Sequence, residues 1–468
     1  MRRIGIFYIF FSDIRVIYKT LGGNKMKNRS PYDLDGVPVL KEAIPLGLQH
    51  ILAMFVSNLA PILIVGGVIG IPSEKLTFLI QCTMFVSGLN TLIQAYRIGP
   101  IGARLPVVVG TSFAFVPVAI SIGLKYGFEG VLGAAMVGGL FEAFIGLFMR
   151  KVRKFFPPIV TGVVVLSIGL SLLPVGIKNL AGGFGAKDFG SLSNLFLGGA
   201  VLIVVIIFNQ FAKGIWRTAA IAVGTVVGVV IAGFMGKINF EAVSQASYFV
   251  VPKPFTYGLE FHLDAILAMM LMYVVSAVET VGDMSGVTMG GANREVTDKE
   301  LSGGILADGF GGVIAASFSI LPTTSFSQNT GIVAMTGVMS RFVVGTGAMF
   351  LLAGAFIPKI GALISVIPAS VIGGSLVMLF AMIAISGINL ITKEKLVGRN
   401  AVIVAVALGI GFGMGSVPDA LQNLPESFKL IFGGSGIVVS AGIAVLLNII
   451  LPKEEAKEER EAVKLKRA

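Results

Sequence analysis

Long apolar runs separated by short charged segments fill most of the chain and give the first prediction. Each run is about 20 residues long, the length that an α-helix needs to cross the hydrocarbon core of a bilayer. The runs predict about 14 membrane spans. With their ends trimmed at flanking charges, the spans fall near residues 43–66, 76–95, 105–123, 130–149, 157–177, 193–212, 218–235, 265–284, 301–319, 322–339, 342–358, 364–387, 401–416 and 434–451. The third and tenth spans are predicted to be discontinuous.

The distribution of lysine and arginine between the spans gives an orientation. If the N-terminus is cytoplasmic, the inner loops hold 14 basic residues, the outer loops hold 8, and no arginine lies outside. An excess of basic residues is typical of cytoplasmic loops. We therefore predict that both termini are cytoplasmic, as an even number of spans requires.

Residues 322–341 interrupt the apolar pattern with the sequence PTTSFSQNTGIVAMTGVMSR. The first part, 323–327, has short, β-favouring residues with hydroxyl groups, whereas the later apolar residues recur at helical spacing. We predict a strand that turns into a half-helix at membrane depth. A bilayer tolerates such a break only where it is buried in protein or lines a cavity. The alternative is a Ser/Thr-rich loop outside the membrane.

A weak internal repeat links this stretch to the first half of the chain. The sequence ILAM at 51–54 recurs 215 residues later, and TSF at 111–113 recurs 213 residues later. The repeat predicts two halves of about seven spans, and halves with an odd number of spans have opposite topology. Inverted repeats with broken helices are typical of secondary transporters. Residues 107–115, VVVGTSFAF, are therefore predicted to form the second strand and half-helix.

The composition agrees with a membrane protein. The chain has 468 residues, of which 55% are hydrophobic and 13% charged, and its mean hydropathy is +0.90. A soluble domain has roughly 25% charged residues, so we predict an all-α polytopic membrane protein. The net charge of +11 does not indicate nucleic acid, because the charges lie between apolar runs and at the tails. One cysteine and two histidines are too few for a His/Cys metal site or an intrachain disulfide.

The two ends of the chain lie outside this pattern. The aromatic-rich run at 4–11 is too short to span a bilayer, and no signal-peptide cleavage site follows it. Met26 precedes a polar lead-in to the first span, so Met26 is a candidate start of translation. The charged tail from 453 to 468 is predicted to be a solvated helix or disordered, with no soluble domain after the last span.

Four acids lie within the predicted spans, which contain no lysine or arginine. Acids inside the membrane are costly, so each is a candidate for function. Glu279 and Asp283 are four residues apart and share a helix face, and we predict a binding or coupling role for them. Asp308 lies among glycines and is predicted either to carry a proton or to hold neighbouring helices. Glu142 has no polar neighbours in sequence, and a structural pairing is predicted for it.

Two adjacent amides, Gln328 and Asn329, lie where the half-helix is predicted to begin. They can offer hydrogen-bond donors and acceptors to a planar polar ligand, and Phe113, opposite them in the repeat, can stack on a ring. An amide, a carboxylate and an aromatic ring fit a neutral heterocycle better than an anion, which would favour arginine or lysine. The alternative is that the amides tie the half-helix to its neighbours. His50 in the first span is either a packing residue or part of this polar network.

The motif that contains the two amides resembles the signature of the nucleobase–ascorbate transporter family, also called the second class of nucleobase:cation symporters. QNTG at 328–331 is followed by four residues and then by Thr336 and Gly337, as in that signature. Further resemblance lies in QH at 49–50, GTSF at 110–113, Glu279 with Asp283, and ADG at 307–309. The resemblance covers about residues 33–452.

The resemblance implies 14 segments arranged in a core domain and a gate domain, with homodimers formed through the gate domains. The core domain would comprise residues 43–150 and 263–359, the gate domain 151–262 and 360–452, and the cytoplasmic tails 1–42 and 453–468. The resemblance also implies uptake coupled to protons or sodium.

In the family pattern, Glu279 and Gln328 hold the base, Phe113 stacks on it, and backbone near Phe326 and Ser327 completes the site. We predict a coupling or site-supporting role for a second set of residues: Asp283, Asp308, His50 and Asn329.

Glutamine at 328 and aspartate at 283 resemble xanthine and urate carriers more than uracil carriers, and the proline of ascorbate carriers is absent. The sequence therefore predicts a transporter of the inner membrane that takes up an oxidised purine such as xanthine with protons. It predicts no cofactor and no enzyme activity, since no nucleophile–base or metal constellation is visible. A uracil permease on the same fold is the first alternative, and an anion permease or channel of the sulfate-transporter type is the second.

Overall fold

Helices make up almost all of the regular structure in the part of the chain that the computed structural model describes, residues 30–433 and 436–452. In chain order the elements are α2 (Leu40–Ile69), α3 (Ser73–Tyr96), β1 (Val109–Thr111), η1 (Phe113–Phe115), α4 (Val116–Leu147), α5 (Met149–Val152), η2 (Arg153–Phe155), α6 (Pro158–Leu180), α7 (Leu192–Phe211), α8 (Ile215–Thr218), α9 (Ala220–Phe234), α10 (Glu241–Gln245), α11 (Leu263–Ala292), α12 (Asp298–Ser317), β2 (Thr323–Ser325), α13 (Ser327–Thr336), α14 (Arg341–Ala355), α15 (Pro358–Ser365), α16 (Ala369–Ile391), α17 (Gly398–Ser416), η3 (Pro418–Leu421), α18 (Glu426–Phe428), η4 (Lys429–Gly433) and α19 (Gly436–Ile450). The predictions for residues 1–25, for Met26 and for the tail at 453–468 fall outside the described residues.

The helices support a multi-pass membrane protein. Eight of those in the described ranges are long and apolar enough to cross a bilayer, or up to ten if each bent helix pair is counted as one span. Each of the 14 predicted ranges overlaps a helix or a strand followed by a helix, but several of these are too short or too polar to pass that test. The count of 14 crossings therefore remains a prediction.

A backbone break divides α4 into two helical parts. Gly127 inside α4 has a φ of 73°, in the left-handed region, which glycine adopts without steric cost. The break lies between the third and fourth predicted spans, at 105–123 and 130–149. The two apolar runs therefore form separate helical parts, joined without a loop.

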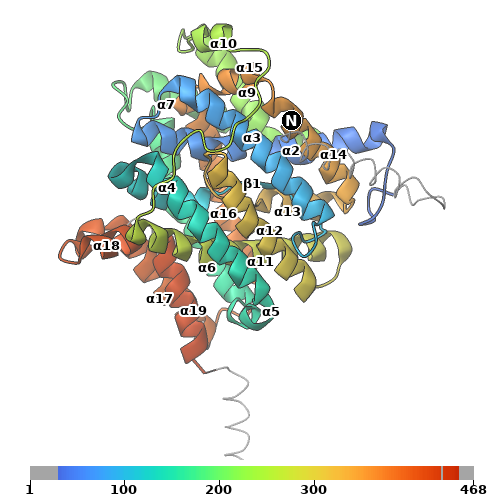
Figure 1. Ribbon diagram of the computed structural model, residues 1–468, viewed down its shortest axis with the longest axis vertical. Coiled ribbons are helices and arrows are strands. Elements are labelled where there is room, and N and C mark those ends of the chain that lie inside the picture. Colours follow the sequence, from blue (N-terminus) through green and yellow to red (C-terminus); the bar gives the residue numbers. More distant parts are fainter. Residues whose placement is uncertain (1–29, 434–435, 453–468) are drawn as a thin grey trace, which may run out of the picture.

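Two short strands lie at the centre of the helical assembly (Figure 1). β1 and β2 pair antiparallel, with Val109 opposite Ser325 and Thr111 opposite Thr323, and every residue of both strands is buried. Helices follow both strands, η1 with α4 after β1 and α13 after β2. The predicted strand-then-helix units at 107–115 and 322–339 are thus confirmed. Antiparallel pairing also means that the chain enters the strands from opposite directions, which supports an inverted repeat.

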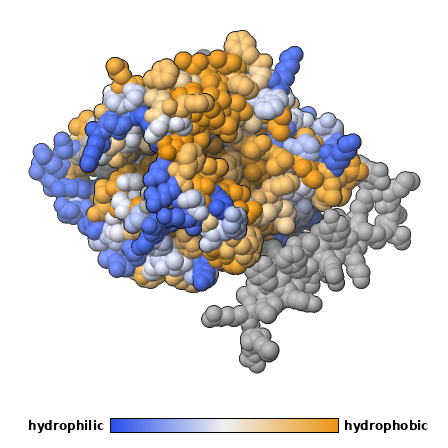
Figure 2. Space-filling model, turned by 90° about the horizontal axis from the view of Figure 1, so that it is seen from above, coloured by the Kyte–Doolittle hydropathy of each residue, from blue (hydrophilic) through white to orange (hydrophobic). Residues whose placement is uncertain are grey.

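Much of the outer surface is apolar, as a lipid-facing protein requires. Figure 2 shows hydrophobic residues over broad areas of one end of the molecule, with hydrophilic groups gathered in patches. Large apolar side chains with more than half of their surface exposed occur on α7 and α9, for example Leu192, Phe196, Phe211, Val226 and Phe234. Since water would disfavour such exposure, these side chains fit contact with lipid or with another apolar surface.

The segment before α2 is attached to the start of α14. The carbonyl of Pro31 accepts hydrogen bonds from the amides of Met339 and Ser340, at 3.0 Å each. The Ser340 hydroxyl donates to the carbonyl of Gly36 at 2.6 Å, and Arg341 forms an ion pair with Asp35. The sequence predicted only a polar lead-in here. In the structure, residues 31–36 bind the chain just beyond the end of α13, and we call this set of contacts the clamp.

Candidate functional site

A small cavity lies where the strand pair, the two half-helices and three long helices meet. Its volume is about 20 Å³, little more than one water molecule needs. The lining residues come from β1 and η1, from β2 and α13, and from α6, α11 and α16: Thr111, Ser112, Phe113, Ala114, Ile168, Glu279, Thr324, Ser325, Phe326, Ser327, Gln328 and Ile383. The cavity brings together all five residues that were predicted to bind substrate.

The local sequence directs two helix N-termini at this cavity. α13 begins at Ser327, directly after the extended residue Phe326, because the β-favouring run ends there. On the other side, the Ser112 hydroxyl accepts a hydrogen bond from the amide of Ala114 and caps η1. The free N–H groups and positive dipole ends of such half-helices are suited to bind polar ligand atoms.

Glu279 offers an unpartnered carboxylate to the cavity. Its side chain comes from α11 and is 8% exposed, and among the described residues Oε2 has no hydrogen-bond partner. A buried polar atom normally has a partner, so an unpaired one calls for an explanation. A ligand that donates N–H groups to this carboxylate would supply that partner.

Asp283 lies one turn further along α11, where the protein itself satisfies its carboxylate. Its Oδ2 accepts a hydrogen bond from Ser325 at 2.8 Å, and its Oδ1 accepts one from Ser327 at 2.7 Å. These bonds bridge the end of β2 and the start of α13. Glu279 and Asp283 therefore share a helix face, as predicted. The carboxylate of Asp283 is occupied by hydrogen bonds within the protein, whereas the carboxylate of Glu279 is available to a ligand.

Asp308 on α12 joins three elements and does not line the cavity. Its Oδ1 accepts from the Gln94 amide at 2.9 Å, and its Oδ2 accepts from the Thr280 hydroxyl at 2.5 Å. Gln94 in turn accepts from the amide of Ala103 at 3.0 Å. Of the two roles predicted for Asp308, these contacts favour that of holding neighbouring helices together.

His50 and Asn329 brace the half-helix through contacts outside the cavity lining. The imidazole Nδ1 of His50 lies 2.5 Å from Oδ1 of Asn329, and Nδ2 of Asn329 donates to the carbonyl of Pro106 at 2.7 Å. Both side chains are buried. Of the two adjacent amides, only Gln328 lines the cavity, whereas Asn329 ties α13 to α2 and to the segment before β1.

Phe113 forms part of the cavity wall, and its ring is in contact with α16. Its centroid lies 4.9 Å from that of Phe380, with the planes at 85°, an edge-to-face arrangement. Ile383 from α16 and Ile168 from α6 also line the cavity. The aromatic residue predicted to stack on a ligand is therefore covered here by elements of the predicted gate domain.

Sequence reasoning missed the polar residues that hold β1. Oδ1 of Asn58 accepts from the amide of Thr111 and from the hydroxyl of Ser87, both at 2.8 Å. The hydroxyl of Thr91 accepts from the amide of Val109 at 2.9 Å. The sequence did contain a signal, because polar residues in α2 and α3 need hydrogen-bond partners once they are buried. The backbone of β1 supplies these partners, since β1 has only one neighbouring strand in the described part of the chain.

Glu142 does not form the structural pairing predicted for it. The side chain is completely buried in α4, and within the described part of the chain neither carboxylate oxygen has a hydrogen-bond partner. Ser276 of α11 lies beside it. Without conventional hydrogen-bond geometry, this proximity is not a satisfied pairing.

The buried acids are not neutralised by basic side chains. None of the ion pairs in residues 30–433 and 436–452 includes Glu279, Asp283 or Asp308. The same residues contain no group of three or more His, Cys, Asp or Glu side chains that could hold a metal ion. The chemistry that this arrangement offers is hydrogen bonding to a polar ligand and exchange of protons.

A multi-pass helical fold with a central cavity at two broken segments defines the class of this protein, a membrane transporter. The model of the Permease family named Xan_ur_permease matches residues 41–420. The chain belongs to this family, and the resemblance to the nucleobase–ascorbate transporters is confirmed.

Relatives named as permeases match most of the chain. It is 38% identical to a xanthine permease of Bacillus subtilis over 87% of this chain and 93% of the relative. It is 38% identical to the uric acid permease PucK of the same organism, over 86% and 94%, and 36% identical to the xanthine permease XanQ of Escherichia coli, over 90% and 93%. These proteins are permeases, so the chain is a transporter and not an enzyme.

Solved structures of other transporters share the fold. The transmembrane domain of the cyanobacterial bicarbonate transporter BicA aligns with a TM-score of 0.52 at 14% identity, covering 88% of this chain and 97% of that one. The murine anion transporter Slc26a9 aligns with a TM-score of 0.57 at 13% identity, covering 88% and 68%. Anion transporters, the second alternative from the sequence, therefore share this fold. The sequence of this chain, however, belongs to the permease family.

Proposed function

We propose that this protein takes up a purine base, such as xanthine or urate, together with protons. The relatives with 36–38% identity over most of the chain are named for xanthine and uric acid. The uracil alternative has no comparable support among these three relatives. Transport activity is thus common to the family, whereas our proposal for the substrate depends on the names of these relatives and on the residues that line the cavity.

The unpaired carboxylate of Glu279 is the observation that carries the proposal. It lines the same cavity as the amide of Gln328 and the ring of Phe113. A carboxylate accepts hydrogen bonds from N–H groups, and an amide both donates and accepts. Such a set matches an oxidised purine, which has N–H and C=O groups along its edges and a flat face for an aromatic ring.

Binding requires the cavity to expand. A base is much larger than the single water that about 20 Å³ can hold. Ile168 of α6 and Ile383 of α16 belong to the predicted gate domain, whereas Glu279 and Gln328 belong to the predicted core domain. Movement of α6 and α16 away from the strand pair would open the cavity, in the manner of two domains that rock against each other.

Proton coupling is supported by the buried acids. An ionised carboxylate is costly to bury without a counter-charge, and no ion pair in the described ranges supplies one to Glu279 or Asp283. A proton that accompanies the substrate would neutralise such a group during transport. We also propose that the protein lies in the inner membrane with both termini in the cytoplasm. The gate domain would form the interface of a homodimer.

Uptake assays in cells that lack their own base permeases test the proposal. The expressed protein should accumulate labelled xanthine or urate far above a vector control and should prefer both to uracil. A protonophore should abolish the accumulation. Expression at normal membrane levels without uptake of any of the three bases would rule the proposal out.

A further inference from the structure

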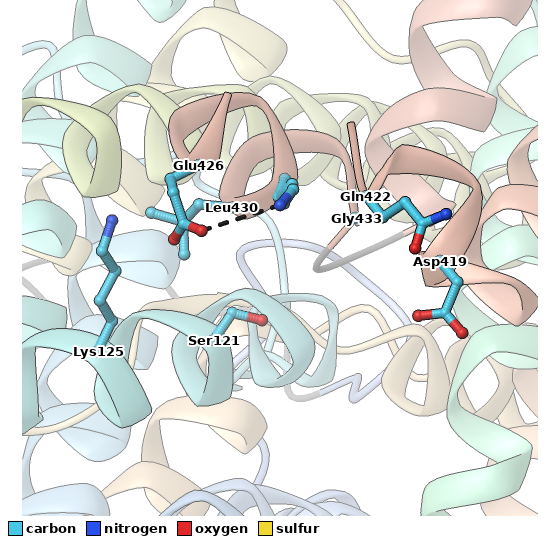
Figure 3. Close-up of a pocket in the computed structure, with 8 residues that line it drawn as sticks. Ser121, Lys125, Asp419, Gln422, Glu426, Leu430 and Gly433 are labelled. Atoms are coloured by element: carbon cyan, nitrogen blue, oxygen red, sulfur yellow. Dashed lines mark ion pairs between the residues drawn. The ribbon is translucent and has the colours of Figure 1, made fainter. Parts of the chain in front are cut away.

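A second, larger pocket opens between α4 and the segment η3–η4. Its volume is about 410 Å³, and its lining consists of Ser121, Lys125, Asp419, Gln422, Glu426, Lys429, Leu430 and Gly433. Figure 3 shows Ser121 and Lys125 on α4, Glu426 facing them, and Gln422 and Asp419 on the far side of the pocket. Lys125 and Lys429 both lie in loops predicted to face the outside. The pocket is therefore placed at the outer end of the molecule.

One face of the continuous run formed by η1 and α4 leads from the central cavity to this pocket. Phe113, Pro117, Ser121 and Lys125 follow one another at intervals of four residues, and residues with that spacing lie on the same side of a helix. Phe113 lines the central cavity, while Ser121 and Lys125 line the outer pocket. At about 1.5 Å per residue, the two sites are separated by roughly 18 Å along the helix.

The outer pocket has the size of a small-molecule site. Ligand pockets usually have volumes of about 300–1,000 Å³, and about 410 Å³ falls in that range. The central cavity, at about 20 Å³, is far below it. In this conformation a base fits the outer pocket and does not fit the central one.

The pocket carries hydrogen-bond donors and acceptors of both charges. Lys429 lies 3.8 Å from Glu426, a separation that leaves ammonium donors free for a ligand. Lys125 is held more firmly, at 3.0 Å from Asp264. Within the described part of the chain, the side chains of Asp419 and Gln422 have no hydrogen-bond partner. A simple anion would be repelled by the carboxylates, whereas a heterocycle with N–H groups and carbonyl or anionic oxygens can use both kinds of group.

We propose that this pocket is an outer capture site for the transported base, occupied before the base enters the central cavity. The inference rests on the proposed function, since it takes the ligand to be an oxidised purine. Lys429 would bind the anionic or carbonyl oxygens, and Asp419 with Gln422 would bind the N–H edge. Capture at the mouth raises the local substrate concentration and the rate of entry.

Transport kinetics of Lys429→Gln and Asp419→Asn test the capture site, with Lys187→Gln as a matched control. Lys187 is an exposed lysine in another predicted outer loop, away from the pocket. We expect Lys429→Gln to raise the KM for urate, an anion at neutral pH, about tenfold while Vmax at saturating urate is retained. Asp419→Asn should raise the KM for xanthine more than that for urate. The control should keep the wild-type values for both bases.

The outcomes separate the two proposals. If the wild-type protein transports bases and both pocket variants keep its KM values, the capture site is refuted while the proposed function stands. A fall in Vmax with unchanged KM would also refute capture, since it would indicate a role in movement. If the wild-type protein transports no base, the proposed function fails, and the capture site fails with it. Asp419 is exposed and the Lys429 side chain is 38% exposed, so loss of the fold is not expected, and membrane levels measured by immunoblot verify this.

Discussion

At the scale of single residues, two acids one turn apart on α11 have different surroundings. Asp283 receives two hydroxyl hydrogen bonds from the strand–helix turn, at 2.8 and 2.7 Å. Glu279 has an unpaired oxygen and lines the cavity. The sequence spacing predicted their shared face but could not separate their roles, because the serines that bind Asp283 are more than 40 positions away in the sequence.

Substitution of Glu279 by glutamine should preserve the protein and abolish transport. The change keeps the shape but removes the charge-assisted hydrogen bond that we propose between Glu279 and the base, and such a bond is about twice as strong as a neutral one. We expect uptake of xanthine to fall at least about tenfold with a normal membrane level. Glu241→Gln, which alters an exposed carboxylate on α10, is the matched control. Normal uptake by a well-expressed Glu279→Gln protein would remove this residue from the site.

Gln328 and Asn329 should respond differently to substitution, because only Gln328 lines the cavity. Loss of a matched polar partner in a desolvated site costs about 1–3 kcal/mol, so Gln328→Glu should weaken xanthine binding by about 5- to 150-fold and uracil binding less. Asn329→Ala removes the brace to His50 and Pro106 and should slow transport of every base. Competition of labelled xanthine by unlabelled bases measures both effects. An unchanged competition profile for Gln328→Glu together with an altered one for Asn329→Ala would mean that the two roles are reversed.

At the scale of elements, Gly110 sets how closely β1 approaches its neighbours. A Cβ atom at this position would lie 2.5 Å from the ring of Phe326 and 2.7 Å from Oδ1 of Asn58, closer than real contacts allow. Gly110→Ala must therefore displace a wall of the cavity or the hydrogen bond that holds β1. We expect a loss of about 1–3 kcal/mol in stability, as for other overpacked sites, and a higher KM.

Thermal unfolding in detergent and uptake kinetics measure this effect. Gly199→Ala on α7 is the control, because nothing lies within 4 Å of a Cβ atom there. A Gly110→Ala protein with the stability and KM of the wild type would show that the strand pair is looser than the structure indicates.

The capping box at the start of α12 gives a prediction for pH dependence. Burial would raise the pKa of Glu300, but hydrogen bonds from Arg294 and Thr297 keep it below its usual value. An acid whose pKa is lowered in the folded state contributes stability above its unfolded pKa, about 4.3, and this contribution is lost as the pH falls. Glu300→Gln should therefore lower the Tm at pH 7 by a few degrees, roughly the effect of 1 kcal/mol. The difference from the wild type should shrink below about pH 4, and a constant difference would contradict the mechanism.

The sequence predicted the broken segments better than it predicted what surrounds them. Residues 323–325 could be predicted as a strand because their side chains favour β structure and their neighbours repeat at 111–113. The clamp formed by residues 31–36 could not be predicted, since backbone carbonyls of a polar segment make most of its contacts. The hydrogen bonds of Asn58 and the unpaired state of Glu142 were also missed, because partners depend on helix packing, which a single sequence does not encode in its local pattern.

At the scale of the whole molecule, the central cavity is small, at about 20 Å³, and the outer pocket is large, at about 410 Å³. The isoleucines in the cavity wall come from α6 and α16, whereas the polar residues come from the strand pair, α11 and α13. This division follows the predicted core and gate domains. A bicarbonate and an anion transporter share this fold, so the arrangement of helices alone does not determine which substrate is carried.

Transport should depend on the proton gradient and not on sodium. The buried carboxylates at 279, 283 and 308 are among the least exposed in the described part of the chain, at 8%, 6% and 0%, and none has a basic partner there. Because a charged group without a partner is costly at this depth, binding of a proton together with the base lowers the cost of moving both. We expect a protonophore to reduce initial xanthine uptake about tenfold or more, and replacement of sodium by choline to leave it unchanged. Initial rates should also rise as the external pH is lowered from 8 to 6. A strict sodium requirement would overturn proton coupling, while leaving the proposed role of Glu279 in binding the base unaffected, because that role is argued from the cavity and is tested separately by Glu279→Gln.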